Sequence, residues 1–131
     1  MQLQITTDYA IRIIGYLAQH RNQLMNANEM AEQLGITYQY FFKVAMRLKE
    51  AGLIESEQGR HGGYRLAKEA GDITLYDIVE TMEGIICINR CLESDGYCSR
   101  LATPTCSVHK ILASLQSDII TILKNKKMSD L

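Results

Sequence analysis

The fold of this chain is decided by residues 37–66, TYQYFFKVAMRLKEAGLIESEQGRHGGYRL. Thr37 is a favourable N-cap, and Gly52 ends the helical pattern that follows it. Within that pattern apolar side chains recur at the i, i+3, i+4, i+7 spacing of one buried face, at Phe41, Val44, Ala45 and Leu48. Two strand-like runs, 53–56 and 64–67, come next, joined by a glycine-rich basic connection. The stretch therefore predicts a helix followed by a two-stranded hairpin.

A second short helix precedes this stretch. Asn26 with Glu29 resembles a capping box, and Gly35 is a natural C-cap. Two short helices joined by a tight turn form a helix-turn-helix, and a hairpin directly after it makes the fold a winged helix. The second helix of such a fold enters the major groove of double-stranded DNA, while the wing tip reaches the backbone or the minor groove. The predicted DNA-binding residues are Tyr38, Gln39, Tyr40, Lys43 and Arg47 on the helix and Arg60 and His61 on the wing.

Two further helices complete the DNA-binding region, which we place at residues 1–84. The first is expected to run from residue 6 or 7 to about residue 20, with its apolar side chains on one stripe. The other begins at Thr74, where Asp77 faces back to the cap, and it ends at Gly84.

Residues 85–109 hold all four cysteines of the protein and one of its three histidines. Six and then seven residues separate Cys91, Cys98 and Cys106, which is too wide for the tight ligand pairs of a zinc knuckle. Thiols gathered in such a polar loop most often serve a metal or redox chemistry, and soft thiolates select iron–sulfur clusters, zinc or Cu(I). Cys87 instead follows an apolar run, so we expect it to be a buried core thiol.

The end of this loop has the pattern of a helix start. We expect Thr103 to cap a helix and Pro104 to take its first position. Cys106 would then lie in the first turn, where the helix dipole stabilises a thiolate. His109, three residues further on, projects from the same face and is a candidate nitrogen ligand.

Residues 110–131 are predicted to form the remainder of this helix and a tail. The apolar side chains of the helix recur at helical spacing, at Val108, Ile111, Leu112, Leu115, Ile119, Ile122 and Leu123. A helix this apolar needs a partner surface, and since DNA operators are usually two-fold symmetric we expect a homodimer. The predicted fold is thus mainly α: a winged helix-turn-helix with a small two-stranded wing, a cysteine loop and a long C-terminal dimerisation helix.

Composition limits the remaining classes of function. The chain has 131 residues, of which 47% are hydrophobic, enough for one domain with a real core. Its net charge of −1 does not by itself indicate a nucleic-acid partner. It has no apolar run long enough to span a membrane and no signal-peptide pattern, so we expect a cytoplasmic protein. Because it lacks a Ser/His/Asp set, paired carboxylates in a pocket and a phosphate-cradling loop, we do not expect an enzyme.

The order of these motifs resembles the IscR/NsrR group of bacterial transcriptional regulators, which also includes RirA and CymR. The resemblance covers essentially the whole chain and rests on TTDYAIR at 6–12, AGLIES at 51–56, GRHGGYRL at 59–66, ITLYDIV at 73–79 and the three spaced cysteines. It implies a dimeric repressor whose operator affinity is controlled by a [2Fe–2S] or [4Fe–4S] cluster. The implied signal is cluster supply, nitric oxide, iron or redox state.

The resemblance also implies a set of cluster ligands. By position these are Cys91, Cys98 and Cys106. The fourth ligand is His109 by the IscR pattern, in which a histidine follows the last cysteine by three residues. By the NsrR pattern it is Asp8, contributed by the first helix of the other subunit. This sequence has both residues, so the two assignments stay open.

The chain departs from the group at two expected DNA contacts. Gln58-Gly59 stands where the wing usually opens with Arg-Gly, and Phe42 stands where IscR has a glutamate. Two alternatives to the cluster also stay open. One is a cluster-free member whose thiols sense oxidants or a small metabolite, as in the CymR branch. The other is a structural zinc site made of the three cysteines and His109.

Overall fold

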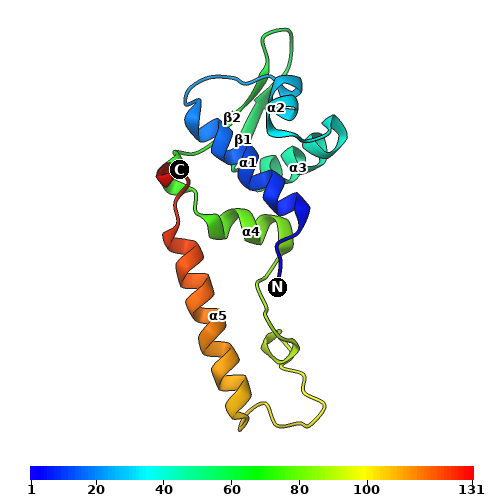
Figure 1. The fold of residues 1–131 in the computed structure, drawn as a ribbon, viewed down its shortest axis with the longest axis vertical. Coiled ribbons are helices and arrows are strands. Elements are labelled where there is room, and N and C mark those ends of the chain that lie inside the picture. Colours follow the sequence, from blue (N-terminus) through cyan, green and yellow to red (C-terminus); the bar gives the residue numbers. More distant parts are fainter.

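The protein is elongated, with the winged-helix elements at one end and the cysteine loop at the other (Figure 1). The computed structural model describes residues 1–131. Its helices are α1 (Ile5–Gln19), α2 (Ala27–Leu34), α3 (Tyr38–Glu50), α4 (Leu75–Glu83) and α5 (Ser107–Asn125). Its strands are β1 (Ile54–Glu57) and β2 (Gly63–Leu66), and three 3₁₀ turns are η1 (Ala70–Asp72), η2 (Arg90–Leu92) and η3 (Met128–Asp130). This confirms the mainly α winged helix-turn-helix with a small wing and a long C-terminal helix.

The core lies where α1, α2 and α3 pack together with α4. The predicted inward stripe of α3 is confirmed, because Phe41, Val44, Ala45 and Leu48 are all fully buried. Facing them, α1 contributes Ala10, Ile13, Ile14 and Leu17. These side chains come from elements far apart in the sequence, so their burial fixes the angle at which α3 presents its other face to solvent.

Local capping explains where α2 and α3 begin and end. The side chain of Asn26 accepts a hydrogen bond from the Glu29 N–H at 3.1 Å, and Thr37 accepts one from the Tyr40 N–H at 3.3 Å. Between the two helices Gly35 has a φ of 66°, a left-handed conformation that glycine adopts without steric cost. The predicted helix-turn-helix is therefore formed by short-range interactions.

The wing is an antiparallel pair in which Ile54 lies opposite Leu66 and Glu57 opposite Gly63. The strands are shifted by one residue from the predicted runs. At the start of β2, Gly63 passes close to Met25, and a side chain at this position would clash with the Met25 carbonyl oxygen. This close approach lets Met25 exchange two backbone hydrogen bonds with Tyr64, at 2.8 and 2.9 Å, which extends pairing along that edge.

Helix α4 joins the winged helix to the rest of the molecule. Its predicted capping box is confirmed: Thr74 accepts from the Asp77 N–H at 3.2 Å, and Asp77 accepts from the Thr74 N–H at 2.8 Å. Ile78, Val79 and Met82 are buried, as their spacing indicates. Gly84 ends the helix.

The long helix begins later than the sequence predicted. Residues 103–105 form a turn, in which the Thr105 N–H donates to the Ala102 carbonyl at 3.0 Å. Cys106 is therefore the N-cap residue of α5, with an extended backbone, and does not lie in its first turn. No side chain of α5 is buried within the chain.

Beyond α5 the chain returns to the winged helix. Met128 is 3% exposed and belongs to the same core cluster as α1 and α3. Its N–H donates to the Ile73 carbonyl at 2.9 Å, beside a bridge between Thr74 and Lys127. No helix of the structure is both long enough and apolar enough to cross a membrane.

Candidate functional sites

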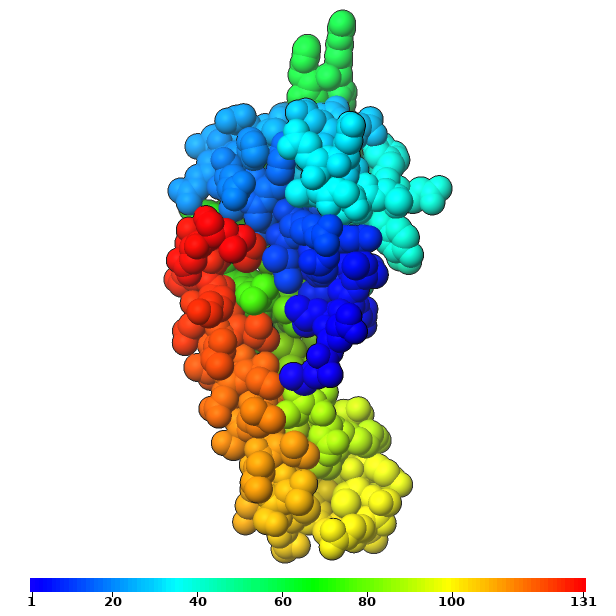
Figure 2. Space-filling view, viewed as in Figure 1, coloured from blue at the N-terminus to red at the C-terminus, as the bar shows by residue number.

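The first candidate site is the outward face of α3 together with the wing, which projects beyond the body of the molecule (Figure 2). Tyr38, Gln39 and Lys43 are exposed along α3, as predicted. Arg60 and His61 are exposed at the wing tip. The helix and the wing tip therefore offer amide, aromatic and cationic groups to one partner.

Charge on the wing is distributed unevenly. Arg65, in the stem, pairs with Glu55 at 2.5 Å and with Glu57 at 3.2 Å, and the hydrogen bond to Glu55 raises the pKa of Arg65 above its ordinary value. Arg60 at the tip takes part in none of the ion pairs of the structure. The tip is thus the part of the wing whose positive charge is available to phosphate.

Two residues predicted to bind DNA also make contacts within the chain. The guanidinium of Arg47 donates to the Thr81 carbonyl of α4 at 2.8 Å. The ring of Tyr40 meets that of Tyr9 edge-on, with centroids 6.0 Å apart, although Tyr40 remains exposed. Both contacts tie α3 to neighbouring helices.

The second candidate site is the cysteine loop. It brings Cys91 next to His109, with 3.3 Å between Sγ and Nδ1. The side-chain amide of Asn89 donates to the same sulfur at 3.2 Å. Two of the predicted ligands, 18 residues apart in the sequence, therefore lie in contact, one on η2 and the other on α5.

The other two thiols predicted as ligands are Cys98 and Cys106, and both are partly exposed. Backbone N–H groups of Ala102 and Arg100 hold the pKa of the Cys98 thiol below its ordinary value, because they stabilise the thiolate, the form that binds metals. Cys98 and Cys106 are both half-buried and outside any disulfide. No three donors among the Cys, His, Asp and Glu side chains converge as a metal site in this structure. Three thiols and an imidazole suit an iron–sulfur cluster or zinc by their chemistry. Of these donors, Cys91 and His109 are already in contact.

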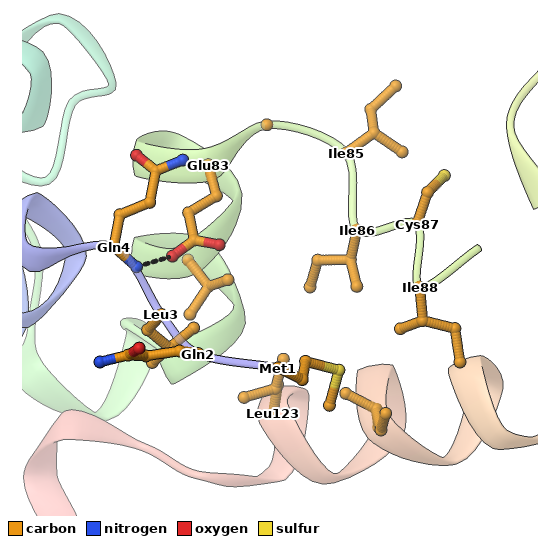
Figure 3. A pocket seen from close by; sticks show the side chains of 13 residues that line it. Met1, Gln2, Leu3, Gln4, Glu83, Ile85, Ile86, Cys87, Ile88 and Leu123 are labelled. Carbon is orange, nitrogen blue, oxygen red and sulfur yellow. Dashed lines mark hydrogen bonds between the residues drawn. The ribbon is translucent and has the colours of Figure 1, made fainter. Parts of the chain in front are cut away.

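Cys87 differs from its prediction, since it is half-buried and is not part of the core. With a φ of 83°, Gly84 directs the chain away from α4, and the next residue, Ile85, is 84% exposed. The thiol donates to the Leu92 carbonyl at 3.5 Å. Cys87 lies beside a largely apolar cavity of about 410 Å³ between the N-terminal segment, α4 and α5 (Figure 3).

Asp8, the other candidate for the fourth ligand, forms an ion pair with Arg12 at 2.5 Å. Arg12 in turn donates to the Leu34 carbonyl at 3.0 Å, just before the turn of the helix-turn-helix. Within one chain, His109 and not Asp8 is the candidate that contacts a cysteine of the loop.

An ion pair that the sequence did not reveal joins Arg90 and Asp95 within the loop. The guanidinium of Arg90 donates to both carboxylate oxygens of Asp95, at 2.6 and 2.7 Å, and these bonds lower the pKa of Asp95 to about 2. The same guanidinium lies 5.0 Å from the ring centroid of Tyr97. A spacing of five residues in an irregular segment matches no helical or strand pattern, so nothing in the sequence pointed to this pair.

A helix-turn-helix with an exposed second helix and a cationic wing tip defines a winged-helix DNA-binding protein. The sequence pattern of the Rrf2 family, described as iron-dependent transcriptional regulators, matches residues 3–131. The chain therefore belongs to the Rrf2 family of transcriptional regulators, which confirms the resemblance to the IscR/NsrR group.

Individual relatives agree with this assignment. The HTH-type transcriptional regulator NsrR of Shouchella clausii is 32% identical over 136 residues, covering 100% of this chain and 88% of that protein. The structure of CymR, the global cysteine regulator of B. subtilis, matches with a TM-score of 0.81 at 21% identity, over 99% of this chain and 95% of CymR. IscR of T. potens matches with a TM-score of 0.78 at 23% identity, over 99% and 85%. The two structures share the fold.

Proposed function

We propose that this Rrf2 regulator is a repressor that binds a double-stranded operator and whose affinity is set by an iron–sulfur cluster in the cysteine loop. The ligands are Cys91, Cys98, Cys106 and His109. The observation that carries this proposal is the contact of 3.3 Å between Cys91 and His109, which joins a thiol to an imidazole in a polar loop. The family description as iron-dependent and the NsrR relative support the same cofactor.

The bound cluster supplies an oxidisable inorganic centre that iron, nitric oxide or redox state can change. The chain's own residues transmit that change. His109 lies in the first turn of α5, and the far end of α5 leads into Met128 in the winged-helix core. Tying Cys98 and Cys106 to His109 therefore alters the position of α5 relative to α3. Cluster-loaded and cluster-free protein then differ in operator affinity only to the extent that their two conformations interact differently with the operator.

We further propose a homodimer built on α5. Val108, Ile111, Leu115 and Ile122 form one apolar stripe that is exposed in the single chain. Their spacing of three, four and seven residues is that of a helix seam. A second copy would cover this stripe and place two copies of α3 about one DNA turn apart, which suits a two-fold operator.

A cluster-free thiol sensor is the second candidate, and the chemistry of the Cys98 thiol supports it, since this thiol is half-buried and outside any disulfide. In that function Cys98, with its lowered thiol pKa, would be the first thiol to react. A structural zinc site of the three cysteines and His109 is a third possibility for the same loop.

The test begins with protein purified without oxygen. Iron with acid-labile sulfide supports the cluster, stoichiometric zinc supports a structural site, and neither supports the thiol sensor. Operator affinity is then measured at one salt concentration for loaded and cluster-depleted protein. Equal affinity for every operator would reduce the cluster to a structural part and end the sensing proposal.

A further inference from the structure

Helix α3 carries an apolar feature on its outward face that the core does not explain. Tyr38 is 47% exposed and Phe42 is 41% exposed. Their rings lie one helical turn apart and meet edge-on, with centroids at 4.7 Å and planes at 75°. The pair is therefore a preformed aromatic surface on the helix that would enter the major groove.

The packing of α3 does not require this pair. Its inward stripe is already filled by Phe41, Val44, Ala45 and Leu48, all fully buried. Phe42 turns the other way, onto the face that also bears Gln39 and Lys43. Exposure of a phenyl ring to water is unfavourable. Docking of this face relieves that cost only if the partner offers an apolar group that covers the ring.

Among the base edges in the major groove, only one chemical group is apolar. Base edges there present hydrogen-bond donors and acceptors, and the C5-methyl of thymine is the one apolar group among them. A phenyl ring can neither donate nor accept in the manner of an amide or guanidinium, so it discriminates bases through that methyl. The groove, about 12 Å wide, admits a helix with side chains of this size.

We propose that Phe42, supported edge-on by Tyr38, is a specificity-determining residue that contacts a thymine methyl in each operator half-site. This inference rests on the proposed docking of α3 in the major groove and adds which base the helix selects. Gln39 and Lys43, on the same face, supply the polar contacts beside it. The operator therefore contains an A·T pair at the position that faces Phe42.

The test removes only the methyl group. Duplexes are selected from a random pool by the protein purified without oxygen, and each thymine of the selected half-site is then replaced by deoxyuridine. This change keeps the Watson–Crick and groove hydrogen bonds and deletes the C5-methyl. For the wild-type protein, one position of the half-site should respond. There, each methyl group removed should lower the affinity about fourfold, the value for one buried methyl group.

The matched variants are Phe42→Ala and Met46→Ala. Both positions are exposed on α3 outside the core, so both variants should remain folded. Phe42→Ala should bind the thymine and the deoxyuridine duplexes equally, whereas Met46→Ala should keep the fourfold difference.

Two results would overturn the proposal, and they are distinguishable. If the protein enriches no duplex, the docking of α3 fails and the thymine contact fails with it. If duplexes are enriched but deoxyuridine costs nothing at any position, or costs the same in Phe42→Ala as in the wild type, only the thymine contact is wrong.

Discussion

At the scale of single residues, Arg60 allows a phosphate contact to be tested apart from folding. Its guanidinium is exposed at the wing tip and takes part in no ion pair. We therefore expect Arg60→Ala to weaken operator binding and to lower the slope of log affinity against log salt by about 1 per protomer. Lys110→Ala, an exposed cation on α5, is the control and should change neither. An unchanged slope in Arg60→Ala would remove the wing tip from the DNA interface.

The thiols provide a second prediction at this scale. Replacing Cys91, Cys98 or Cys106 by Ala should abolish bound iron measured without oxygen, because each removes one ligand. Cys87→Ala is the matched control, since its thiol is engaged by the Leu92 carbonyl and not by His109. Iron retained in full by any of the three, with iron lost from Cys87→Ala, would contradict the assignment.

The fourth ligand is tested by the same measurement. His109→Ala should lose iron or shift the visible spectrum of the cluster, whereas Asp8→Ala should not, because Asp8 is held by Arg12 in the structure. The opposite result would assign the ligand to Asp8 of a second subunit, as in the NsrR pattern.

At the scale of elements, the last turn of α4 is held on two sides. Arg47 of α3 donates to the Thr81 carbonyl. On the other side, the hydroxyl of Thr7 and the backbone N–H of Gln4 both donate to one carboxylate oxygen of Glu83, each at 2.8 Å. This turn leads directly into the segment that carries the cysteines, so it links the loop to α1 and α3.

Removing the buried hydroxyl should loosen that link. Thr7 is fully buried, and Thr7→Val deletes the donor while keeping the side-chain shape. We expect it to lower the free energy of unfolding by about 1.5–3 kcal/mol, the cost of a lost hydrogen bond to a charged group. Urea denaturation with an unchanged m-value measures this. Thr6→Val, at a half-buried neighbour without a side-chain hydrogen bond, should change stability little; equal losses in both would contradict the role of the hydroxyl.

At the scale of elements, the sequence predicts some helices correctly and one helix start wrongly. Elements fixed by short-range chemistry were predicted, such as α3 from Thr37 and its apolar stripe, and α4 from the Thr74–Asp77 capping box. The start of α5 was wrong because Thr103 and Pro104 are equally suited to a turn, and the Thr105 N–H closes one onto Ala102. Propensity does not choose between the two.

The candidate sites follow the same division. The exposed face of α3 was predicted because helical periodicity separates it from the core. The contact of Cys91 with His109 was anticipated only as a shared ligand set, and the Arg90–Asp95 pair was missed, because both depend on how an irregular loop folds. Cys87 was placed in the core on the strength of its apolar neighbours, whereas Gly84 turns that segment outward.

At the scale of the whole molecule, α5 connects the two candidate sites. One end carries His109 beside the cysteine loop, and the other is fixed to the winged helix through Met128 in its core (Figure 1). Gln116, near the middle of α5, accepts a hydrogen bond from the Ile88 N–H at 2.9 Å. The helix is therefore attached to the rest of the chain at both ends and along one side, which leaves the apolar stripe that flanks this side for a second copy.

That stripe gives the last prediction. Val108, Ile111, Leu115 and Ile122 are about half to two-thirds exposed in the single chain, and full burial of each against a partner would contribute at most roughly 1.5–3 kcal/mol toward a dimer. A variant with both Ile111→Glu and Leu115→Glu should sediment as a folded monomer and bind the two-fold operator far more weakly, because two charges from each subunit would be buried in the seam. Ser117→Glu, on the opposite side of the helix, should remain a dimer. A double variant that still sediments as a dimer would show that the subunits associate through another surface.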